Sequence, residues 1–267
     1  MSEVPELFDL KDQVAIVTGG AGRLGSQMSD VLAEAGAHVI IAARNLSRSQ
    51  EKARQLSDKF NEAAAVSVDV TLPASVQAMT DAVEKKFGRI DILVNAAYSG
   101  EHKRFEELTM EEFESAIRGG LTSTFLCCQS VSRIMKTVRR GVIINIGSVY
   151  GVVAPDQRIY GDVGNNSPCN YGASKAGVIQ LTRWLATYLA PHRIRVNCLT
   201  PGGFYNDALA QETEYREVFA RNYSDRTPLG RMGNKTDLKG ALLLLASSAS
   251  EYMTGQNLVV DGGWTAW

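Results

Sequence analysis

Residues 14–25 read VAIVTGGAGRLG, a short apolar run that leads directly into a glycine-rich turn. The run VAIVT has the length and β-branched content of a buried strand, and the residues after the turn have the spacing of an amphipathic helix. Glycines between a strand and a helix let the backbone approach a diphosphate, whose charge then lies at the helix N-terminus. The stretch therefore predicts a nucleotide-binding turn formed by Gly19, Gly22, Arg23, Leu24 and Gly25.

The alternation of strand and helix continues along the chain. Further β-branched runs typical of strands lie at 38–42, 64–69, 91–96, 142–147, 194–199 and 257–261. Helical patterns near 25–35, 48–60 and 74–87 separate the first of these, and 171–190 has the pattern of another helix. Apolar strands that alternate with helices predict a parallel sheet covered on both faces, the doubly wound, three-layer α/β Rossmann fold. We expect a single such domain over residues 1–267.

Composition bears on the class of protein. The chain has 267 residues, is 45% apolar and 21% charged, and has a formal net charge of −1. These values are ordinary for a globular enzyme that acts on a small molecule, and they favour neither a nucleic-acid nor a membrane partner. No apolar run approaches the roughly 20 residues that span a bilayer, and the N-terminus lacks an apolar signal core. We expect no metal site, a cytoplasmic location, and buried reduced thiols at Cys127, Cys128, Cys169 and Cys198.

The end of the second strand bears on the choice of nicotinamide cofactor. In sheets of this kind an acidic residue at this place binds the ribose 2′-hydroxyl, whereas a nearby arginine accommodates a 2′-phosphate. The stretch IIAARN at 40–45 has no acid and contains Arg44. An arginine that only faces solvent is the alternative. The sequence favours NADP(H) over NAD(H).

Other strand ends supply further candidates for contact with the cofactor. Small or polar residues at these ends allow the backbone to approach a flat ring, although each could also be a simple turn. The candidates are Asp69, Val70, Asn95, Ala96 and Ala97.

The motif YGASK begins at Tyr171 and ends at Lys175, which places both residues on one face of a helix. An ammonium group near a phenol stabilises the phenolate and lowers its pKa, so that the phenol can exchange a proton with a substrate oxygen. Ser148, just past the fifth strand, can donate a hydrogen bond to the same oxygen. The alternative is a tyrosine and a lysine on the surface of an amphipathic helix. The three residues together predict a catalytic site.

Over nearly its whole length the chain resembles a short-chain dehydrogenase/reductase. The resemblance rests on the turn at 18–25, Asp69, NAA at 95–97, Ser148, YGASK, RVNCLTPGG at 195–203 and VDGGW at 260–264. The family implies hydride transfer between nicotinamide and a carbonyl or secondary alcohol. It also implies a homotetramer, Tyr171 as acid and base, Ser148 as substrate orienter, Lys175 as a ribose contact that tunes the tyrosine, and Pro201 and Gly202 beside the nicotinamide.

The chain departs from the family pattern at several positions. The usual NNAG is NAAY, which ends at Tyr98, and the asparagine of the usual catalytic tetrad aligns with Gly120. Glycine permits the backbone distortion associated with that asparagine but cannot supply its amide. The glycine spacing TGxxGxxG resembles the extended branch of sugar epimerases and dehydratases. The chain length and the tail favour the compact branch with an insertion, and Asn206 stands where a threonine is usual.

The insertion at about 152–169 is polar and is anchored by catalytic candidates at both ends. We therefore expect it to cover the substrate together with a lid at about 203–228, although packing against a neighbouring subunit is the alternative. Hydrogen-bonding groups in the insertion favour a sugar-like or hydroxy-acid substrate. Tyr160 lies nearer to the serine than Tyr171 does, but the residue four further on is Gly164, not lysine. The candidate substrate contacts are Tyr98, Arg158 and Tyr160.

Three functions remain open. The favoured one is an NADP(H)-linked carbonyl reductase or alcohol dehydrogenase. The second is a nucleotide-sugar epimerase or dehydratase that recycles a bound nicotinamide. The third is a non-catalytic nucleotide-binding protein, which Gly120 suggests and which the complete set of Ser148, Tyr171 and Lys175 opposes.

Overall fold

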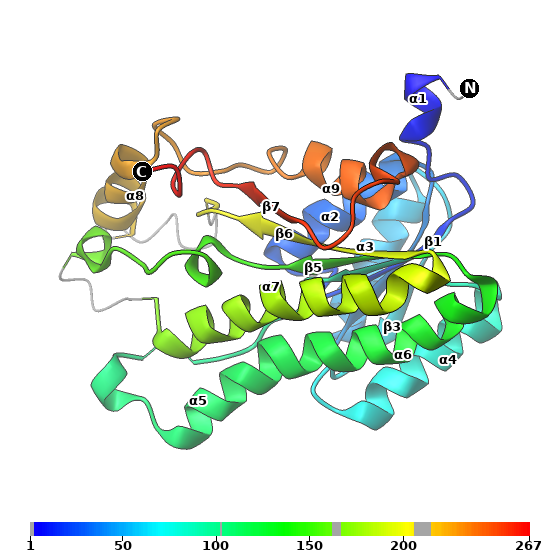
Figure 1. Ribbon diagram of the computed structural model, residues 1–267, viewed down its shortest axis with the longest axis horizontal. Helices are drawn as coiled ribbons and strands as arrows, with labels where there is room; N and C mark the ends of the chain where they lie inside the picture. Colours follow the sequence, from blue (N-terminus) through cyan, green and yellow to red (C-terminus); the bar gives the residue numbers. More distant parts are fainter. Residues whose placement is uncertain (1–2, 102, 162–166, 206–214) are drawn as a thin grey trace.

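A parallel sheet forms the centre of the molecule (Figure 1). The computed structural model describes residues 3–101, 103–161, 167–205 and 215–267. The strands are β1 (Val14–Thr18), β2 (His38–Ala43), β3 (Ala63–Ser67), β4 (Ile92–Asn95), β5 (Gly141–Ile146), β6 (Ile194–Pro201) and β7 (Asn257–Val260). Their order is β3-β2-β1-β4-β5-β6-β7, and every pairing is parallel. The chain reverses its direction of travel across the sheet after β3, which confirms the doubly wound fold.

Helices cover both faces of the sheet (Figure 1). One layer contains α2 (Arg23–Glu34), α3 (Leu46–Ser57) and α9 (Lys239–Ala246). The other contains α4 (Pro73–Phe87), α6 (Ser123–Val138) and α7 (Cys169–Leu189). Three shorter helices, α1 (Val4–Leu7), α5 (Met110–Ile117) and α8 (Arg221–Arg226), lie at the margins.

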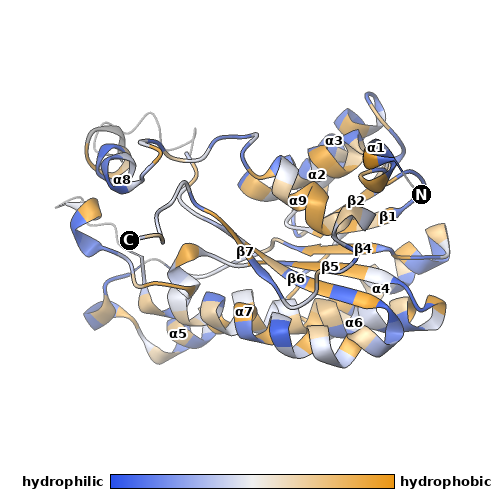
Figure 2. Cartoon of the chain, turned by 45° about the horizontal axis from the view of Figure 1, so that its top comes forward, coloured by the Kyte–Doolittle hydropathy of each residue, from blue (hydrophilic) through white to orange (hydrophobic). Residues whose placement is uncertain are grey.

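Strand β1 shows why both layers are needed, since all five of its residues are buried. Val17 packs into the core that includes Leu32 of α2, whereas Ile16 packs into the opposite core with Val83 of α4. Burying a side chain of this size contributes about 1.5–3 kcal/mol, so a strand that is apolar on both sides stabilises both layers. In Figure 2 the strands are mostly orange, while blue residues lie mainly on the outer surfaces of the helices.

A smaller apolar core lies at the carboxyl end of the sheet, beyond the two main cores. It joins Ile159 and Tyr160 of the insertion to Tyr223 of α8 and to Trp264 of the tail. The rings of Tyr223 and Trp264 stack at a centroid distance of 4.1 Å. The insertion, part of the lid and the tail are therefore packed together next to the strand ends.

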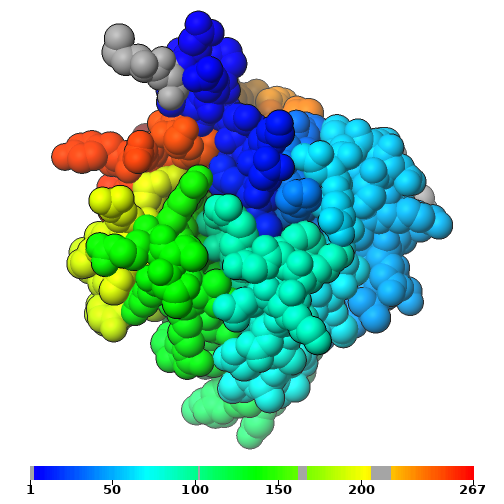
Figure 3. Space-filling view, turned by 90° about the vertical axis from the view of Figure 1, so that its right-hand side faces the viewer, coloured from blue at the N-terminus to red at the C-terminus, as the bar shows by residue number. Residues whose placement is uncertain are grey.

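The amino-terminal end of the sheet faces the viewer in Figure 3, where the blue N-terminal segment lies beside orange residues near the C-terminus. A hydrogen bond from the Ser248 hydroxyl to the Leu7 carbonyl, 2.9 Å long, joins these segments. In the described ranges, no helix is both long and apolar enough to cross a membrane. The expectation of buried thiols is confirmed for Cys127, Cys128 and Cys198 but is wrong for Cys169, which lies exposed on the first turn of α7.

Candidate active site

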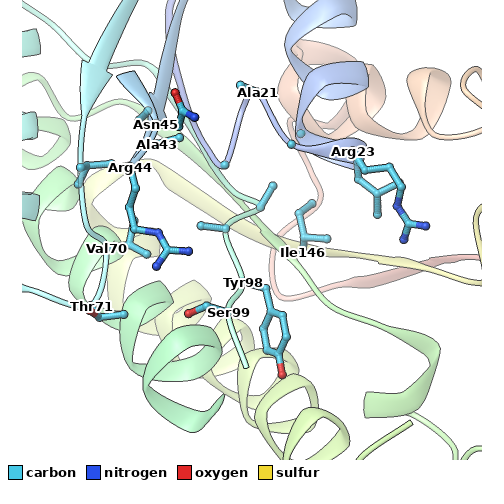
Figure 4. Close-up of a pocket in the computed structure, with 18 of the residues that line it drawn as sticks. Ala21, Arg23, Ala43, Arg44, Asn45, Val70, Thr71, Tyr98, Ser99 and Ile146 are labelled. Atoms are coloured by element: carbon cyan, nitrogen blue, oxygen red, sulfur yellow. The ribbon is translucent and has the colours of Figure 1, made fainter. Parts of the chain in front are cut away.

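A groove of about 570 Å³ follows the carboxyl ends of the strands (Figure 4). Most of the residues that the sequence predicted for the site line it. These are Gly19, Gly22, Arg23, Leu24, Gly25, Arg44, Asp69, Val70, Ala96, Ala97, Tyr98, Ser148, Tyr171, Lys175, Pro201 and Gly202. The groove lies on both sides of the point where the strand order reverses, the place where open α/β sheets bind nucleotides.

The glycine-rich turn packs closely against the end of β4. Gly19 has a φ of 67°, which favours glycine, and a Cβ on Gly25 would lie 2.2 Å from the Gly19 carbonyl oxygen. The Thr18 hydroxyl accepts hydrogen bonds from the backbone N–H groups of Ala96 and Ala97, at 3.2 and 3.3 Å. Thr18, which the sequence motif did not single out, therefore fixes the turn relative to the strand end. The glycines leave room for a dinucleotide backbone at the start of α2.

One end of the groove is basic. Arg44 follows β2, and Arg48 lies in the first turn of α3, where its N–H donates to the Asn45 side chain at 2.9 Å. Both arginines are exposed and line the groove, and Figure 4 shows Arg44 extended along it. Sequence reasoning missed Arg48, because it placed the helix near residues 48–60. The helix begins at Leu46, so Arg48 lies in its first turn, close to the end of β2.

Asp69 occupies the turn after β3 at the same end. Its Oδ1 accepts hydrogen bonds from the Thr71 hydroxyl at 2.7 Å and from the Thr71 N–H at 2.9 Å. These two bonds, with a smaller contribution from the charge of Arg44, hold the pKa of Asp69 below its usual value. The carboxylate is therefore ionised at neutral pH, and one of its oxygens is occupied within the turn.

Asn95, another predicted cofactor contact, points into the protein. Its side chain is buried, does not line the groove, and donates a 2.9 Å hydrogen bond to the side-chain oxygen of Asn145. Asn145 in turn donates to the Thr182 hydroxyl on α7 at 2.9 Å. In this structure the Asn95 side chain joins β4 to β5, and its neighbours Ala96 and Ala97 reach the groove instead.

Ser148, Tyr171 and Lys175 lie together on the groove. Ser148 is buried directly after β5, and Tyr171 and Lys175 project from the first two turns of α7. The Lys175 ammonium donates a 2.7 Å hydrogen bond to the Ile146 carbonyl, and its Nζ lies 5.9 Å from the centroid of the Tyr171 ring. The structure therefore brings the three predicted catalytic residues to one place.

The protonation of this group differs from the sequence-based expectation. We expected the ammonium of Lys175 to lower the pKa of Tyr171. Burial instead raises that pKa, although a hydrogen bond with Ser148 and the charge of Arg23 partly offset the effect. Burial also lowers the pKa of Lys175 to about 8, because the ammonium is removed from water.

Gly120 lies in a distorted part of the helix that faces Ser174 of α7. The chain forms a π-helix over Arg118–Thr122, between α5 and α6, so the expected backbone distortion is confirmed. A Cβ on Gly120 would lie 2.1 Å from the Ser174 hydroxyl oxygen and 3.2 Å from the Tyr98 ring. The space that a side chain at this position would need is therefore already filled by two other residues.

Tyr98 packs directly on the predicted catalytic residues. Its ring meets that of Tyr171 edge to face, with 5.0 Å between centroids, and the Lys175 Nζ lies 5.5 Å from the Tyr98 centroid. The hydroxyls of Tyr98 and Ser174 are buried and have no hydrogen-bond partner among the residues that the structure describes. Burial raises the pKa of Tyr98 well above its usual range, so this phenol stays neutral.

The other two predicted substrate contacts lie away from the groove. Arg158 is exposed and its guanidinium binds both carboxylate oxygens of Asp156, at 2.9 Å each. Tyr160 is buried and stacks on Phe219 at a centroid distance of 5.2 Å. Neither side chain lines the groove, because each is held by a partner from the insertion or the lid. Residues 162–166 and Asn206 lie outside the described residues.

Comparison with known proteins identifies relatives over almost the whole chain. A family model described as "Enoyl-(Acyl carrier protein) reductase" matches residues 20–265. The chain is 34% identical to a 3-oxoacyl-(acyl-carrier-protein) reductase from Vibrio cholerae, over 96% of this chain and 98% of the relative. It is 33% identical to a D-threitol dehydrogenase from Mycolicibacterium smegmatis, over 97% of this chain and 95% of the relative.

A solved structure shows the same similarity in three dimensions. The gluconate 5-dehydrogenase from Burkholderia cenocepacia, in complex with NADP and tartrate, superposes with a TM-score of 0.89. It is 33% identical and is covered over 100% of its length, with 99% of this chain covered. The chain belongs to the short-chain dehydrogenase/reductase family. It is accordingly an NAD(P)-dependent oxidoreductase of the kind that interconverts a carbonyl and a secondary alcohol.

The lowered pKa of Lys175 predicts a pH-dependent stability. The pKa of about 8 lies below the 10.5 of an exposed lysine, so the unfolded chain binds more protons between these two values. The free energy of unfolding should therefore rise with pH across this window, by up to about 3 kcal/mol. The free energy of unfolding can be measured with denaturant at about pH 7 and at about pH 10.5. The wild type should show the rise between these two values, and Lys175→Met should not. An identical pH dependence in the two proteins would contradict the assignment.

The crowding at Gly120 predicts an energetic coupling with Tyr98. Gly120→Asn should reduce the free energy of unfolding by about 1–3 kcal/mol, because the new side chain overlaps a packed ring and a hydroxyl. Tyr98→Gly removes the ring, so the double variant should be more stable than the sum of the two single changes predicts. Chemical denaturation of the four proteins measures this coupling. Single effects that simply add would show that the two positions are independent.

Proposed function

We propose that this protein is an NADP(H)-dependent reductase or dehydrogenase that acts on a small, polar substrate of the sugar or hydroxy-acid class. The observation that carries the proposal is the arrangement of the groove. Ser148, Tyr171 and Lys175 lie together on it, and Arg44 and Arg48 line its basic end. Both groups line one groove, so a dinucleotide lying along it would place its reactive ring next to the tyrosine and its other end next to the arginines.

The roles of the three side chains follow from their chemistry. When bound, the nicotinamide would supply the hydride that reduces a carbonyl carbon, or accept it in the reverse direction. Tyr171 donates its phenolic proton to the carbonyl oxygen as that oxygen gains negative charge. Ser148 donates a hydrogen bond to the same oxygen and holds it in position.

Lys175 supports this proton transfer by its charge. Its ammonium favours the phenolate that remains after Tyr171 has lost its proton. Burial opposes that charge, and the hydrogen bond to the Ile146 carbonyl offsets part of the cost. A proton from solvent then restores the phenol and completes the cycle.

The preference for NADP(H) rests on the basic end of the groove. Arg44 and Arg48 present two guanidinium groups, and guanidinium forms bidentate hydrogen bonds with phosphate oxygens. The nearest acidic candidate, Asp69, already holds Thr71 within its turn. The NADP in the structure of the gluconate 5-dehydrogenase relative supports the same choice.

The substrate class is supported by the relatives. Of the three relatives described above, one is named for a polyol and one for a sugar acid. The glycine spacing at 18–25 still favours an epimerase or dehydratase as the second candidate. An assay with a panel of keto acids, sugars and simple ketones separates the two, because only the first function consumes NADPH.

The homotetramer and the cytoplasmic location stay predictions. An apolar face supports self-association, since Phe125 on α6 and Trp184 and Tyr188 on α7 are exposed. The rings of Trp184 and Tyr188 stack at a centroid distance of 4.9 Å, so they form one continuous surface. We propose that a second copy of the chain covers this face.

Tyr171→Phe tests the proposed acid and base. The change removes one oxygen, so the turnover number should fall by at least about 100-fold. Binding of NADPH, followed by its fluorescence, should stay close to that of the wild type. A variant that kept most of its rate would show that another group transfers the proton.

Arg44→Asp tests the cofactor preference. The substitution replaces a phosphate-binding cation with the acid that binds a ribose hydroxyl, so the ratio of kcat/KM for NADPH over NADH should fall about tenfold or more. Arg140→Asp makes the same charge change just before β5, at the opposite end of the sheet, and serves as the control. A ratio that falls equally in both variants would reflect net charge and not a contact with the cofactor.

A further inference from the structure

Arg23 stands at the end of the groove opposite Arg44 (Figure 4). It is the first residue of α2, and its exposed side chain lines the groove. Its Nη1 donates a 3.2 Å hydrogen bond to the Phe204 carbonyl, beyond the end of β6. The guanidinium therefore reaches from the glycine-rich turn to the segment that follows Gly202, next to the predicted catalytic residues.

Arg23 lines the same groove as Tyr171 and Ser148. Arg23 is the cation that lowers the pKa of Tyr171, against the larger effect of burial, so the guanidinium and the phenol are electrostatically coupled. Across residues 3–101, 103–161, 167–205 and 215–267, no carboxylate forms an ion pair with Arg23. A guanidinium has five N–H donors, and the bond to Phe204 uses one of them.

Three other cations that the sequence brings into consideration for the site are engaged by partners within the protein. Lys175 donates to the Ile146 carbonyl, and Lys103 forms an ion pair with Glu112. Arg158, the cation that the sequence suggested for substrate binding, is held by Asp156 away from the groove. Arg23 is therefore a cation with open donors on the groove that Tyr171 lines, at the end opposite Arg44.

We propose that Arg23 binds a carboxylate of the substrate and thereby directs the reacting carbonyl toward Tyr171 and Ser148. The proposal rests on the proposed function and narrows its substrate class to an acidic sugar or a hydroxy acid. A planar carboxylate matches the edge of a guanidinium, which makes such a pair directional as well as attractive. Arg23 would then be a specificity-determining residue that the predicted cofactor turn supplies.

The competing role for Arg23 is contact with the diphosphate of the cofactor. The start of α2 already offers backbone N–H groups to a diphosphate, and the Arg23 side chain leaves that turn to reach Phe204. The two roles differ in what a substitution should weaken. Loss of a cofactor contact weakens NADP binding, whereas loss of a substrate contact weakens only an anionic ligand.

The test uses tartrate and threitol of the same configuration with NADP-saturated full-length protein. The two probes share a four-carbon dihydroxy skeleton, and threitol has hydroxymethyl groups where tartrate has carboxylates. Isothermal titration should show that the wild type binds tartrate more tightly than threitol. Arg23→Gln should weaken tartrate binding at least about tenfold and leave threitol binding unchanged, because only the charged contact is lost.

Arg140→Gln is the matched control, because Arg140 is exposed just before β5, at the opposite end of the sheet and outside the groove. With NADP at saturation it should leave the preference for tartrate over threitol intact. The inference is overturned if wild type shows no such preference, if Arg23→Gln keeps it, or if Arg23→Gln weakens NADP binding alone. In these three cases NADP still binds the wild type, so the proposed function stands. A wild-type protein that binds no NADP overturns both.

Discussion

The candidate site depends on one hydrogen bond, from the buried Lys175 ammonium to the Ile146 carbonyl. An ammonium group in a protein interior is costly unless its donors find acceptors, and the carbonyl at the end of β5 provides one. The bond ties the second turn of α7 to the strand that leads into Ser148. Tyr171, one turn earlier on α7, is thereby brought to the side of the groove that holds Ser148. A helix face and a strand end thus become one site.

Two of the departures from the family pattern, at positions 98 and 120, are complementary in volume. Tyr98 stands where the family has glycine, and Gly120 stands where it has asparagine. The Tyr98 ring and the Ser174 hydroxyl occupy the volume that a side chain on Gly120 would need. Tyr98 also packs its ring against Tyr171 and near the Lys175 ammonium, an arrangement in which the π face attracts the cation. An aromatic contact therefore lies beside the predicted catalytic pair where the family pattern has an amide.

Much of the fold and the centre of the site could be predicted from the sequence, because both depend on short-range periodicity. The apolar runs predicted every strand, and the spacing of Tyr171 and Lys175 predicted a shared helix face. The direction of individual side chains was less accessible, since it depends on packing between distant segments. Asn95 points inward because its amide bonds to the Asn145 side chain. Arg158 points away from the groove because its guanidinium bonds to the Asp156 carboxylate. No local pattern records either partner.

The ion pairs of the insertion also bear on which residues select the substrate. Asp156 binds both Arg158 and Arg226, which joins the insertion to α8 through charges that are then unavailable to a ligand. The ring of Tyr160 in the insertion stacks on Phe219 and is likewise unavailable to a ligand. The described part of the insertion therefore stabilises the wall beside the groove more than it presents groups to a substrate. Arg23, on the turn predicted to bind the nucleotide, lines the groove together with Tyr171, and its charge acts to lower the pKa of that tyrosine against the larger effect of burial. Residues 14–25 would then contribute both to the formation of the fold and to the selection of the substrate.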